Sequence, residues 1–305
     1  MVMDVHGRDL RYFVAVAEEL HFTRAAESLY VSQPALSKQI RALERQLGAP
    51  LFERDRHGVR LTPVGTALLP HARAVLAAWD EAQTALRRAK EAAGDATLVV
   101  GMSTSPGRGG LLPAIRSRFT EAHPEVRLKL RQVGWDDPSA GLADGTSDVA
   151  FVWLPLADAE RYRWVVVATE PRLVALPTGH PLAGRARVDF ADLLDEPFLA
   201  LPSTTPALRD HWLALDARGG RAPLIGGEIA GADETYEALV DGLGVCLVAA
   251  GNAPLLTRGG VVVRPVDGLS PTRFALAWRA DDTRTLVQDY VRAAATHRTS
   301  PPEVP

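Results

Sequence analysis

The chain has 305 residues, of which 47% are hydrophobic, and this length and composition predict a globular protein with two or three domains. Its formal net charge of -3 argues against a protein that coats nucleic acid along its whole surface, but it leaves room for one local basic face. The single cysteine, Cys246, excludes an intramolecular disulfide and is interpreted as a buried thiol, because it lies in the apolar run GVCLVAA.

The first residues, MVMDVHGRDL, contain no apolar core of a signal peptide, and no stretch approaches the roughly 20 apolar residues of a membrane span. We therefore expect a cytoplasmic protein. The eight histidines are scattered and no cysteine pair exists, so we expect neither a bound metal nor another cofactor.

Three short helices are predicted in the N-terminal part of the chain. The apolar residues of the first recur at helical spacing: Leu10, Phe13, Val14, Ala17 and Leu20. The second is predicted to be capped by Thr23 and to bury Ala25 and Ala26. It ends at residues 29–31, a segment with the length of the turn in a helix-turn-helix.

The third helix is predicted to have one buried stripe and one basic face. The stripe follows the helical repeat and consists of Leu36, Ile40, Leu43 and Leu47, with Ser32 as the N-cap. At about 100° per residue, the opposite face carries Pro34, Lys38, Arg41 and Arg45, with Ser37 beside them. This pattern suits a helix that inserts into a groove of DNA. The alternative is an exposed amphipathic helix with an ordinary solvated face.

A hairpin is predicted in ERDRHGVRLT, where His57-Gly58 supplies the turn between two short extended arms. Arg54, Arg56 and Arg60 lie on these arms, close in sequence to the basic helix. We interpret the hairpin as a wing that contacts DNA, and a plain surface hairpin is the alternative.

A long helix is predicted to start at Thr62-Pro63, with the hydroxyl as cap and proline in the first turn. Its apolar residues keep a 3.5-residue period and are Leu68, Ala72, Val75, Trp79, Ala82 and Leu86. We interpret this helix, residues 63–94, as a linker and dimerisation helix that follows a DNA-binding domain at residues 1–62. The alternative is packing on its own domain.

From residue 95 onward, apolar strands alternate with helices, which predicts an α/β domain over residues 95–298. The last strands and helix can return to the first group, so we predict two lobes joined by crossing strands. The first lobe is assigned to about 95–163 and 268–298, and the second to about 164–267. Residues 299–305 are predicted to be a disordered tail.

One strand-to-helix junction, Ser103 to Gly110, places hydroxyls and free backbone N–H groups at a helix terminus. Such a junction suits a carboxylate or a phosphate, and a simple helix cap is the alternative. Trp135 and Trp153 are candidate walls of the same site, with a role in the core as the alternative.

Taken together, these segments resemble the LysR-type transcriptional regulator family over nearly the whole chain. The motif FTRAAESLYVSQPALSKQIRALERQLGAPLF follows the DNA-binding pattern of that family, and LLPAIRSRFTEAHPEV, GTSDVAFV and GHPLA resemble its sensor domain. The resemblance implies an N-terminal winged helix-turn-helix, a long linker helix and a two-lobed α/β sensor domain similar to periplasmic binding proteins. The function implied is a ligand-responsive, sequence-specific DNA-binding transcriptional regulator without enzymatic activity.

Site residues follow from the resemblance position by position. Gln33, Pro34, Ser37 and Lys38 are implied to contact bases and backbone, and Arg54 and Arg56 to grip phosphate or the minor groove. The full candidate DNA-binding set is Thr23, Ser32, Gln33, Pro34, Ser37, Lys38, Arg41, Arg54 and Arg56. The candidate effector-binding set is Ser103, Thr104, Ser105, Trp135, Trp153, Pro202, Ser203, Thr204 and Asp233.

Two departures from the family pattern concern the effector class. Many members carry proline near Ala249, and the positions of Trp135 and Trp153 often hold smaller or polar residues. The expected partners are double-stranded promoter DNA and a small organic effector, for which the hydroxyl-rich junction favours an anion. The expected assembly is a homodimer through the linker helix and, by resemblance, a homotetramer.

Two other functions are alternatives. The run GMSTS superficially resembles the nucleophile elbow of a hydrolase, but it lacks the second glycine and the sequence marks no Asp or His partner. A solute-binding protein for uptake would explain the two-lobed part alone. The absence of a signal peptide and the basic N-terminal module argue against it.

Overall fold

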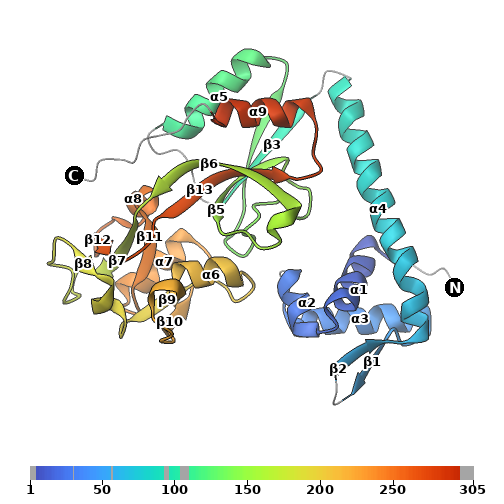
Figure 1. The fold of residues 1–305 in the computed structure, drawn as a ribbon, viewed down its shortest axis with the longest axis horizontal. Helices are drawn as coiled ribbons and strands as arrows, with labels where there is room; N and C mark the ends of the chain where they lie inside the picture. The colour runs from blue at the N-terminus through green and yellow to red at the C-terminus, as the bar shows by residue number, and fades with distance from the viewer. Residues whose placement is uncertain (1–4, 30, 56–57, 93–95, 104–109, 296–305) are drawn as a thin grey trace. The chain divides into compact units, whose positions relative to one another are not determined.

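The computed structural model describes residues 5–29, 31–55, 58–92, 96–103 and 110–295 (Figure 1). The chain divides into two compact units, residues 1–94 and 95–305, which are described separately below. The predicted tail at 299–305 lies outside the described residues. No helix in the described part of the chain is both long enough and apolar enough to cross a membrane.

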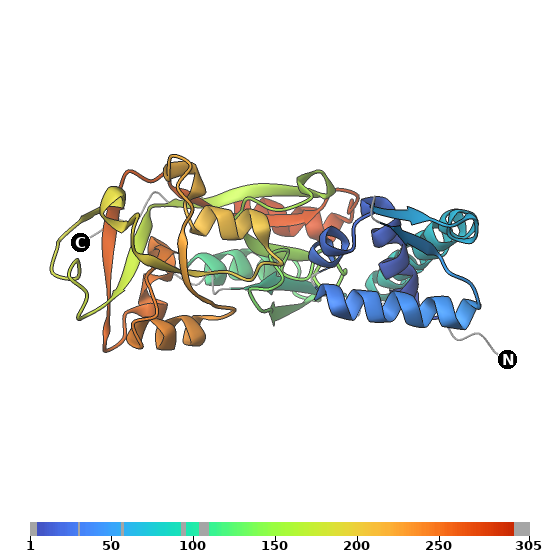
Figure 2. The ribbon, with the colours of Figure 1, turned by 90° about the horizontal axis from the view of Figure 1, so that it is seen from below.

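The first unit contains α1 (Gly7–Glu19), α2 (Phe22–Ser28), α3 (Gln33–Leu47), a hairpin of β1 (Phe52–Asp55) and β2 (Gly58–Leu61), and α4 (Pro63–Ala92). Its core joins the inner faces of the first three helices to the base of the hairpin and the start of α4. Leu36, Ile40 and Leu43 are at most 1% exposed, which confirms the predicted stripe of α3. Figure 2 shows α3 in light blue along one side of this unit.

Two of the three predicted helix caps in this unit are confirmed. The Ser32 hydroxyl accepts the backbone N–H of Ala35 at 3.4 Å, and Thr62 Oγ1 accepts that of Gly65 at 3.0 Å. The prediction for Thr23 is wrong, because α2 begins earlier and the N–H of Arg24 donates to Nδ1 of His21 at 3.3 Å. The helix starts there because Phe22, 6% exposed, already packs in the core. Thr23 is left exposed in the first turn.

The predicted apolar face of α4 has two parts. Ala72 is buried and Leu68 is partly buried against the core of the first unit, so for these two residues the alternative of packing on their own domain holds. The reason is that the first turns of α4 pack against α1. Beyond them, Val75, Trp79 and Leu86 are 54%, 58% and 57% exposed. The exposed face therefore begins near Val75.

Leu20 also departs from its prediction. It follows the last turn of α1 in the left-handed conformation, with φ at 46°, and is 45% exposed. The helix ends at Glu19, so the 3.6-residue repeat that places side chains on the core face no longer applies to Leu20.

In the second unit, the first lobe is built on a five-stranded sheet with the order β4-β3-β5-β13-β6. These strands are β3 (Thr97–Met102), β4 (Arg127–Gln132), β5 (Val149–Leu154), β6 (Tyr162–Glu170) and β13 (Thr272–Arg279). Strands β3, β4 and β5 are parallel, and β13 is antiparallel to both of its neighbours. All six residues of β5 are buried, as a central strand covered on both faces requires.

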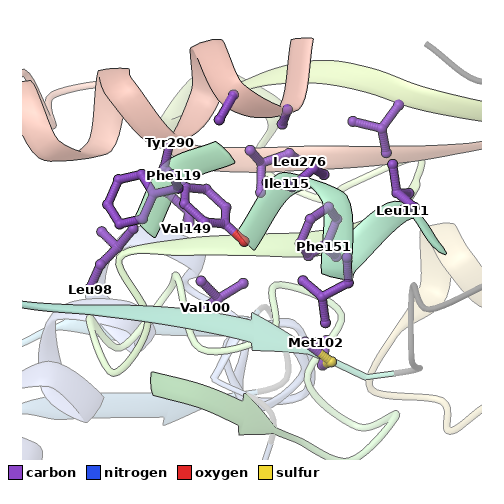
Figure 3. Close-up of a cluster of buried hydrophobic side chains, with 14 of the residues drawn as sticks. Leu98, Val100, Met102, Leu111, Ile115, Phe119, Val149, Phe151, Leu276 and Tyr290 are labelled. Carbon is purple, nitrogen blue, oxygen red and sulfur yellow. The ribbon is translucent and has the colours of Figure 1, made fainter. Parts of the chain in front are cut away.

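Helices α5 (Leu111–Ala122) and α9 (Thr285–Ala295) pack on one face of this sheet. Figure 3 shows Phe119 and Tyr290 from these helices lying over side chains of β3 and β5. Within β3, Gly101 is required by a close approach, because a Cβ there would lie 1.9 Å from the Ala140 carbonyl oxygen. The glycine of GMSTS thus has a packing role.

The second lobe contains a four-stranded sheet with the order β11-β7-β12-β8 and a separate pair of strands, β9 and β10. An isolated bridge from β9 to Val245, the residue before β11, connects the pair to the sheet. Its strands are β7 (Arg172–Pro177), β8 (Val188–Asp189), β9 (Pro197–Ala200), β10 (Leu224–Glu228), β11 (Cys246–Ala249) and β12 (Val261–Asp267). Its helices are α6 (Pro206–Trp212), α7 (Ala232–Val240) and α8 (Ala253–Leu256). The yellow and orange elements of Figures 1 and 2 form this lobe.

Two segments cross between the lobes, as predicted. One joins β6 to β7 at Pro171, and the other joins β12 to β13 over residues 268–271. The first crossing lies later than the predicted boundary near residue 164, because β6 pairs with β13 from Tyr162 to Glu170 and so belongs to the first lobe.

Candidate functional site

The outer face of α3 is basic and accessible. Lys38, Arg41 and Arg45 are all exposed, and within the described part of the chain none of them forms an ion pair. Pro34, in the first turn of the same helix, is exposed as well. Because the opposite face of α3 is sealed in the core, this face is fixed in orientation and its three cations are available to a polyanion.

Ser37 does not belong to that face. It is 2% exposed, so the prediction that it points outward is wrong. Its position lies next to Leu36 and one turn before Ile40, so it falls at the edge of the buried stripe where α2 packs against α3. Its hydroxyl accepts a hydrogen bond from Nε2 of Gln33 at 2.9 Å, and Gln33 is partly exposed at the N-terminal end of the helix.

The predicted wing is present as an antiparallel hairpin with Phe52 opposite Leu61 and Glu53 opposite Arg60. Arg60 lies 3.8 Å from Glu53 in an exposed ion pair. The backbone of Arg54 lies in β1, but its side chain and the whole of Arg56 lie outside the described residues. Their roles therefore stay predictions.

Glu44 ties the wing to α3, a role that the sequence did not reveal. One of its carboxylate oxygens, Oε1, accepts the backbone N–H groups of Leu51 at 2.9 Å and Phe52 at 3.2 Å. The carboxylate thereby holds the start of β1 against the last turns of α3. A glutamate on a helix surface has no sequence signal that distinguishes this contact from solvent exposure.

The second unit contains a cavity between its two lobes, with an empty volume of about 660 Å³ that includes the part open to solvent. Both lobes contribute to its lining. The first provides Ser103, Trp135, Asp137, Pro138 and Trp153. The second provides Leu199, Leu201, Leu208, Trp212, Ile229, Thr235, Cys246, Leu247, Val248, Ala249, Asn252 and Leu256.

Three tryptophans form much of the apolar wall. Trp153 packs edge-on against Trp212, with ring centroids 5.7 Å apart, and so connects β5 of the first lobe to α6 of the second. Trp135 donates from Nε1 to the Ser103 carbonyl oxygen at 3.2 Å, and from its backbone N–H to the Ala230 carbonyl oxygen at 3.3 Å. Trp135 therefore contacts both lobes. Trp135 and Trp153 combine core packing with a position on the cavity wall.

The structure brings together only part of the predicted effector set. Ser103, Trp135 and Trp153 line the cavity, whereas Thr104 and Ser105 lie outside the described residues. Pro202, Ser203, Thr204 and Asp233 are not part of its described lining, so their role in effector binding stays a prediction.

The turn before α6 explains why residues 202–204 lie outside this lining. The backbone N–H and the hydroxyl of Thr205 both donate to the Pro202 carbonyl oxygen at 3.0 Å, so residues 202–205 close a turn at the start of the helix. Ser203 is exposed, and Thr204 Oγ1 is buried without a partner in the described structure. Asp233 lies on the surface, 92% exposed, and pairs with Arg258 at 2.8 Å.

Some polar side chains that line the cavity already form hydrogen bonds with backbone groups of their own turns. The Asp137 carboxylate accepts N–H groups of Ser139 at 3.0 Å and Gly141 at 2.7 Å. The Thr235 hydroxyl donates to the Gly231 carbonyl oxygen at 2.7 Å. Among the described lining residues there is no Lys, Arg or His, so the described wall is mainly apolar. Asp137, Trp212, Thr235, Cys246 and Asn252 were not identified from sequence, because tertiary folding alone brings them here.

Cys246 is 4% exposed, and burial raises the pKa of its thiol to about 12. The thiol therefore stays protonated at neutral pH, which suits packing and disfavours attack on an oxidant. This confirms the interpretation of a buried thiol.

A buried arginine joins the two crossing segments. The side chain of Arg172 is 0% exposed. Its Nε and Nη2 donate to the backbone oxygen and hydroxyl of Ser270 at 2.8 and 2.9 Å, and its Nη1 donates to the His211 carbonyl oxygen at 2.7 Å. Asp216 lies 3.5 Å from Nη2. Burial lowers the pKa of Arg172 from its usual value, and Asp216 opposes that shift.

His211 lies beside this arginine at the end of α6. Its Nε2 is 3.0 Å from Oγ1 of Thr272, at the start of β13. Burial, followed by the charge of Arg172, lowers the pKa of His211 to about 4. Arg172 and His211 thus hold the connection between the lobes through groups that sequence analysis treated as ordinary strand and helix residues.

Comparison with known families agrees with this architecture. The model of the bacterial regulatory helix-turn-helix proteins of the lysR family matches residues 8–66, and the model of the LysR substrate binding domain matches residues 91–298. Among the described residues, no group of three or more His, Cys, Asp and Glu side chains is arranged to hold a metal ion.

Related proteins match along the full architecture. IlvR of Caulobacter vibrioides is 33% identical over 306 residues, covering 98% of this chain and 100% of IlvR. HcaR, the Hca operon transcriptional activator of Escherichia coli, is 33% identical over 93% of this chain and 95% of its own. The structure of full-length BenM has a TM-score of 0.54 with 29% identity and covers 96% of both chains.

The second family model alone spans more than half of the chain, and these relatives exceed 30% identity over nearly its full length. Their regulator names agree with the predicted lack of enzymatic activity. The chain belongs to the LysR family of DNA-binding transcriptional regulators, with an N-terminal helix-turn-helix and a C-terminal effector-binding domain.

Proposed function

We propose that α3 reads a specific promoter sequence and that a small organic effector in the interlobe cavity alters how the protein engages that promoter. The observation that carries the first part is the exposed cationic face of Lys38, Arg41 and Arg45 on a helix whose other face is fixed in the core. The hairpin wing, which Glu44 ties to α3, favours this proposal over an ordinary amphipathic helix with a solvated charged face.

The cations and the helix start have different roles in this proposal. Lys38, Arg41 and Arg45 neutralise phosphates and set the register of the helix, whereas Gln33 and Pro34 at its N-terminal end contact base edges. Arg54 and Arg56 of the wing grip the adjacent backbone. Ser32 serves as the helix cap.

The effector is a small organic molecule with an apolar or aromatic body. Trp135, Trp153 and Trp212 support this class, because flat aromatic walls favour flat apolar ligands. The predicted negative charge depends on the junction from Ser103 to Gly110, where α5 begins. Only Ser103 of its hydroxyl residues is described, and it lines the cavity.

The protein assembles through α4. Val75, Trp79 and Leu86 form an exposed apolar face that a second copy of α4 would cover. Such a homodimer presents two reading helices and fits an inverted repeat whose half-sites are spaced by whole helical turns. Family resemblance extends this assembly to a homotetramer.

Sequencing the DNA that the full-length protein selects from a random duplex library tests the DNA part. We expect enrichment of an inverted repeat and loss of that enrichment for the Lys38→Ala/Arg41→Ala double variant. The matched control is Arg73→Ala, an exposed arginine of α4 that already pairs with Glu18 at 2.8 Å. Selection of no sequence, or equal enrichment by all three proteins, would refute the assignment.

The effector part is tested by tryptophan fluorescence and thermal unfolding in a metabolite screen. Binding in the cavity should quench or shift emission, because three of the six tryptophans line it. A ligand of the cavity should raise the unfolding temperature and move the DNA footprint of the wild type. If that ligand acts equally on the Trp153→Phe variant and causes the same change in tryptophan emission there, the site lies elsewhere.

A further inference from the structure

The side chain of Gln33 is held by a residue that is buried in this fold. Ser37 is 2% exposed, and its hydroxyl oxygen accepts the hydrogen bond from Gln33 Nε2 at 2.9 Å. The two residues are one helical turn apart, so their side chains lie on neighbouring positions of one face. Gln33 stays partly exposed at the helix start, where the outer end of its amide can meet a partner.

The chemistry of the amide makes its orientation important. A glutamine amide carries two N–H donors on Nε2 and one acceptor oxygen, Oε1, and the torsion that turns the amide is soft. With Nε2 turned toward Ser37, one N–H is used inside the protein, and the second N–H and Oε1 remain for another partner. That remaining pair matches the acceptor N7 and the donor N6 of adenine in the major groove.

We propose that Ser37 is a positioning residue that fixes the Gln33 amide and thereby sets a preference for adenine at one base pair of the operator. The inference rests on the proposed DNA-reading role of α3 and adds which base is read and which buried group determines it. Ser37 acts through Gln33 and contacts no base.

The two partners differ in what their removal does. An alanine at position 37 is a better helix former than serine, and the partly exposed Gln33 amide can exchange its lost partner for water. The fold therefore tolerates Ser37→Ala, but the amide becomes free to rotate. Replacing Gln33 by alanine removes the reading group itself.

The experiment determines base preferences of the full-length protein by selection from random duplexes, followed by titration of the selected operator and its single-base variants. The proteins compared are wild type, Ser37→Ala, Gln33→Ala and the double variant. The matched control is Ser28→Ala, because Ser28 is an exposed helical serine whose hydroxyl donates to the Ala25 carbonyl oxygen at 3.1 Å. Thermal unfolding without DNA verifies that every variant is folded.

We expect Ser37→Ala to lose discrimination for adenine by about fivefold or more at one base pair, the lower range for a bidentate base contact. Gln33→Ala should lose discrimination at the same base pair, and Ser37→Ala should add nothing in that background. Affinity for random DNA and its salt dependence should stay as in wild type and in Ser28→Ala.

The proposal is overturned if Ser37→Ala changes nothing, weakens all sequences equally, alters a different base pair, or adds a further loss to Gln33→Ala. A wild type that selects no sequence would instead remove the proposed function, and the inference with it. The wild-type selection therefore separates these two failures.

Discussion

The cations of α3 and the arginine at the centre of the second unit carry the same charge in opposite settings. Lys38, Arg41 and Arg45 are exposed and form no ion pair within the described residues. Arg172 is 0% exposed, and all three of its guanidinium nitrogens donate hydrogen bonds. An exposed, unpaired charge contributes little to folding and is available to a partner, whereas a buried and bonded charge belongs to the fold.

The largest effect that sharpens this comparison is expected from Arg172→Ala. It removes the charged donors of the Ser270 and His211 carbonyl oxygens and leaves a cavity, which should lower the free energy of unfolding by about 3–5 kcal/mol. Arg41→Ala, the exposed counterpart, should change it by less than about 0.5 kcal/mol. Denaturant unfolding followed by circular dichroism measures both. Equal losses in the two variants would contradict the contrast.

The next effect concerns Cys246, whose reactivity should reflect the same burial. A pKa raised from 9.0 to about 12 lowers the thiolate fraction near neutral pH by roughly a thousandfold. Alkylation by iodoacetamide should therefore be slower than that of a free cysteine by a factor of this order, and urea should abolish the difference. Rapid alkylation of the folded protein would show that the thiol is accessible.

Disruption of the α4 face should have a somewhat smaller effect. Trp79→Glu combined with Leu86→Glu places charges on residues that are 58% and 57% exposed, so the monomer should fold as before. Loss of the second reading helix should weaken operator binding by about 100-fold. Sedimentation or light scattering gives the mass, with Arg73→Ala as control. An unchanged mass would reject α4 as the interface.

The pH dependence of stability should show a contribution from His211. Its folded pKa of about 4 lies below the ordinary value of 6.5, so the unfolded chain binds the proton more readily. The contribution is complete above pH 6.5 and is lost as pH falls toward 4. The difference between the two pKa values caps it at about 3 kcal/mol, and solvent screening of the part-exposed ring lowers it further. The His211→Gln variant should lose less stability than wild type between pH 6.5 and 4.5. Parallel curves would show that His211 does not titrate in this range.

Sequence alone predicted the first unit well wherever local periodicity decides the structure. Leu36, Ile40 and Leu43 fixed the orientation of α3, and with it the exposure of Lys38, Arg41 and Arg45. The misplacement of Ser37 shows the limit of this reasoning. A residue at the edge of a helical stripe is buried or exposed according to the neighbouring helix, which the periodicity of α3 does not contain.

The cavity was harder to predict because its lining comes from distant segments. Trp135, Trp153 and Ser103 line the cavity, and each lies at or near the end of a strand of the first lobe, a position that the sequence pattern predicts. Ser203 and Thr204 were chosen for their hydroxyl groups, but the turn that starts α6 places them off the wall. Arg172 gave no signal, because its partners Ser270 and His211 are separated from it by 98 and 39 residues.

The most direct test of the central claim is the salt dependence of operator binding for wild type and for the Lys38→Ala/Arg41→Ala/Arg45→Ala variant. Each lost phosphate contact lowers the slope of log affinity against log salt by about 0.9, so each triply substituted reading helix should lower it by about two to three. Thermal unfolding of the variant should match wild type. An unchanged slope in a folded variant would show that the exposed cations of α3 do not contact DNA.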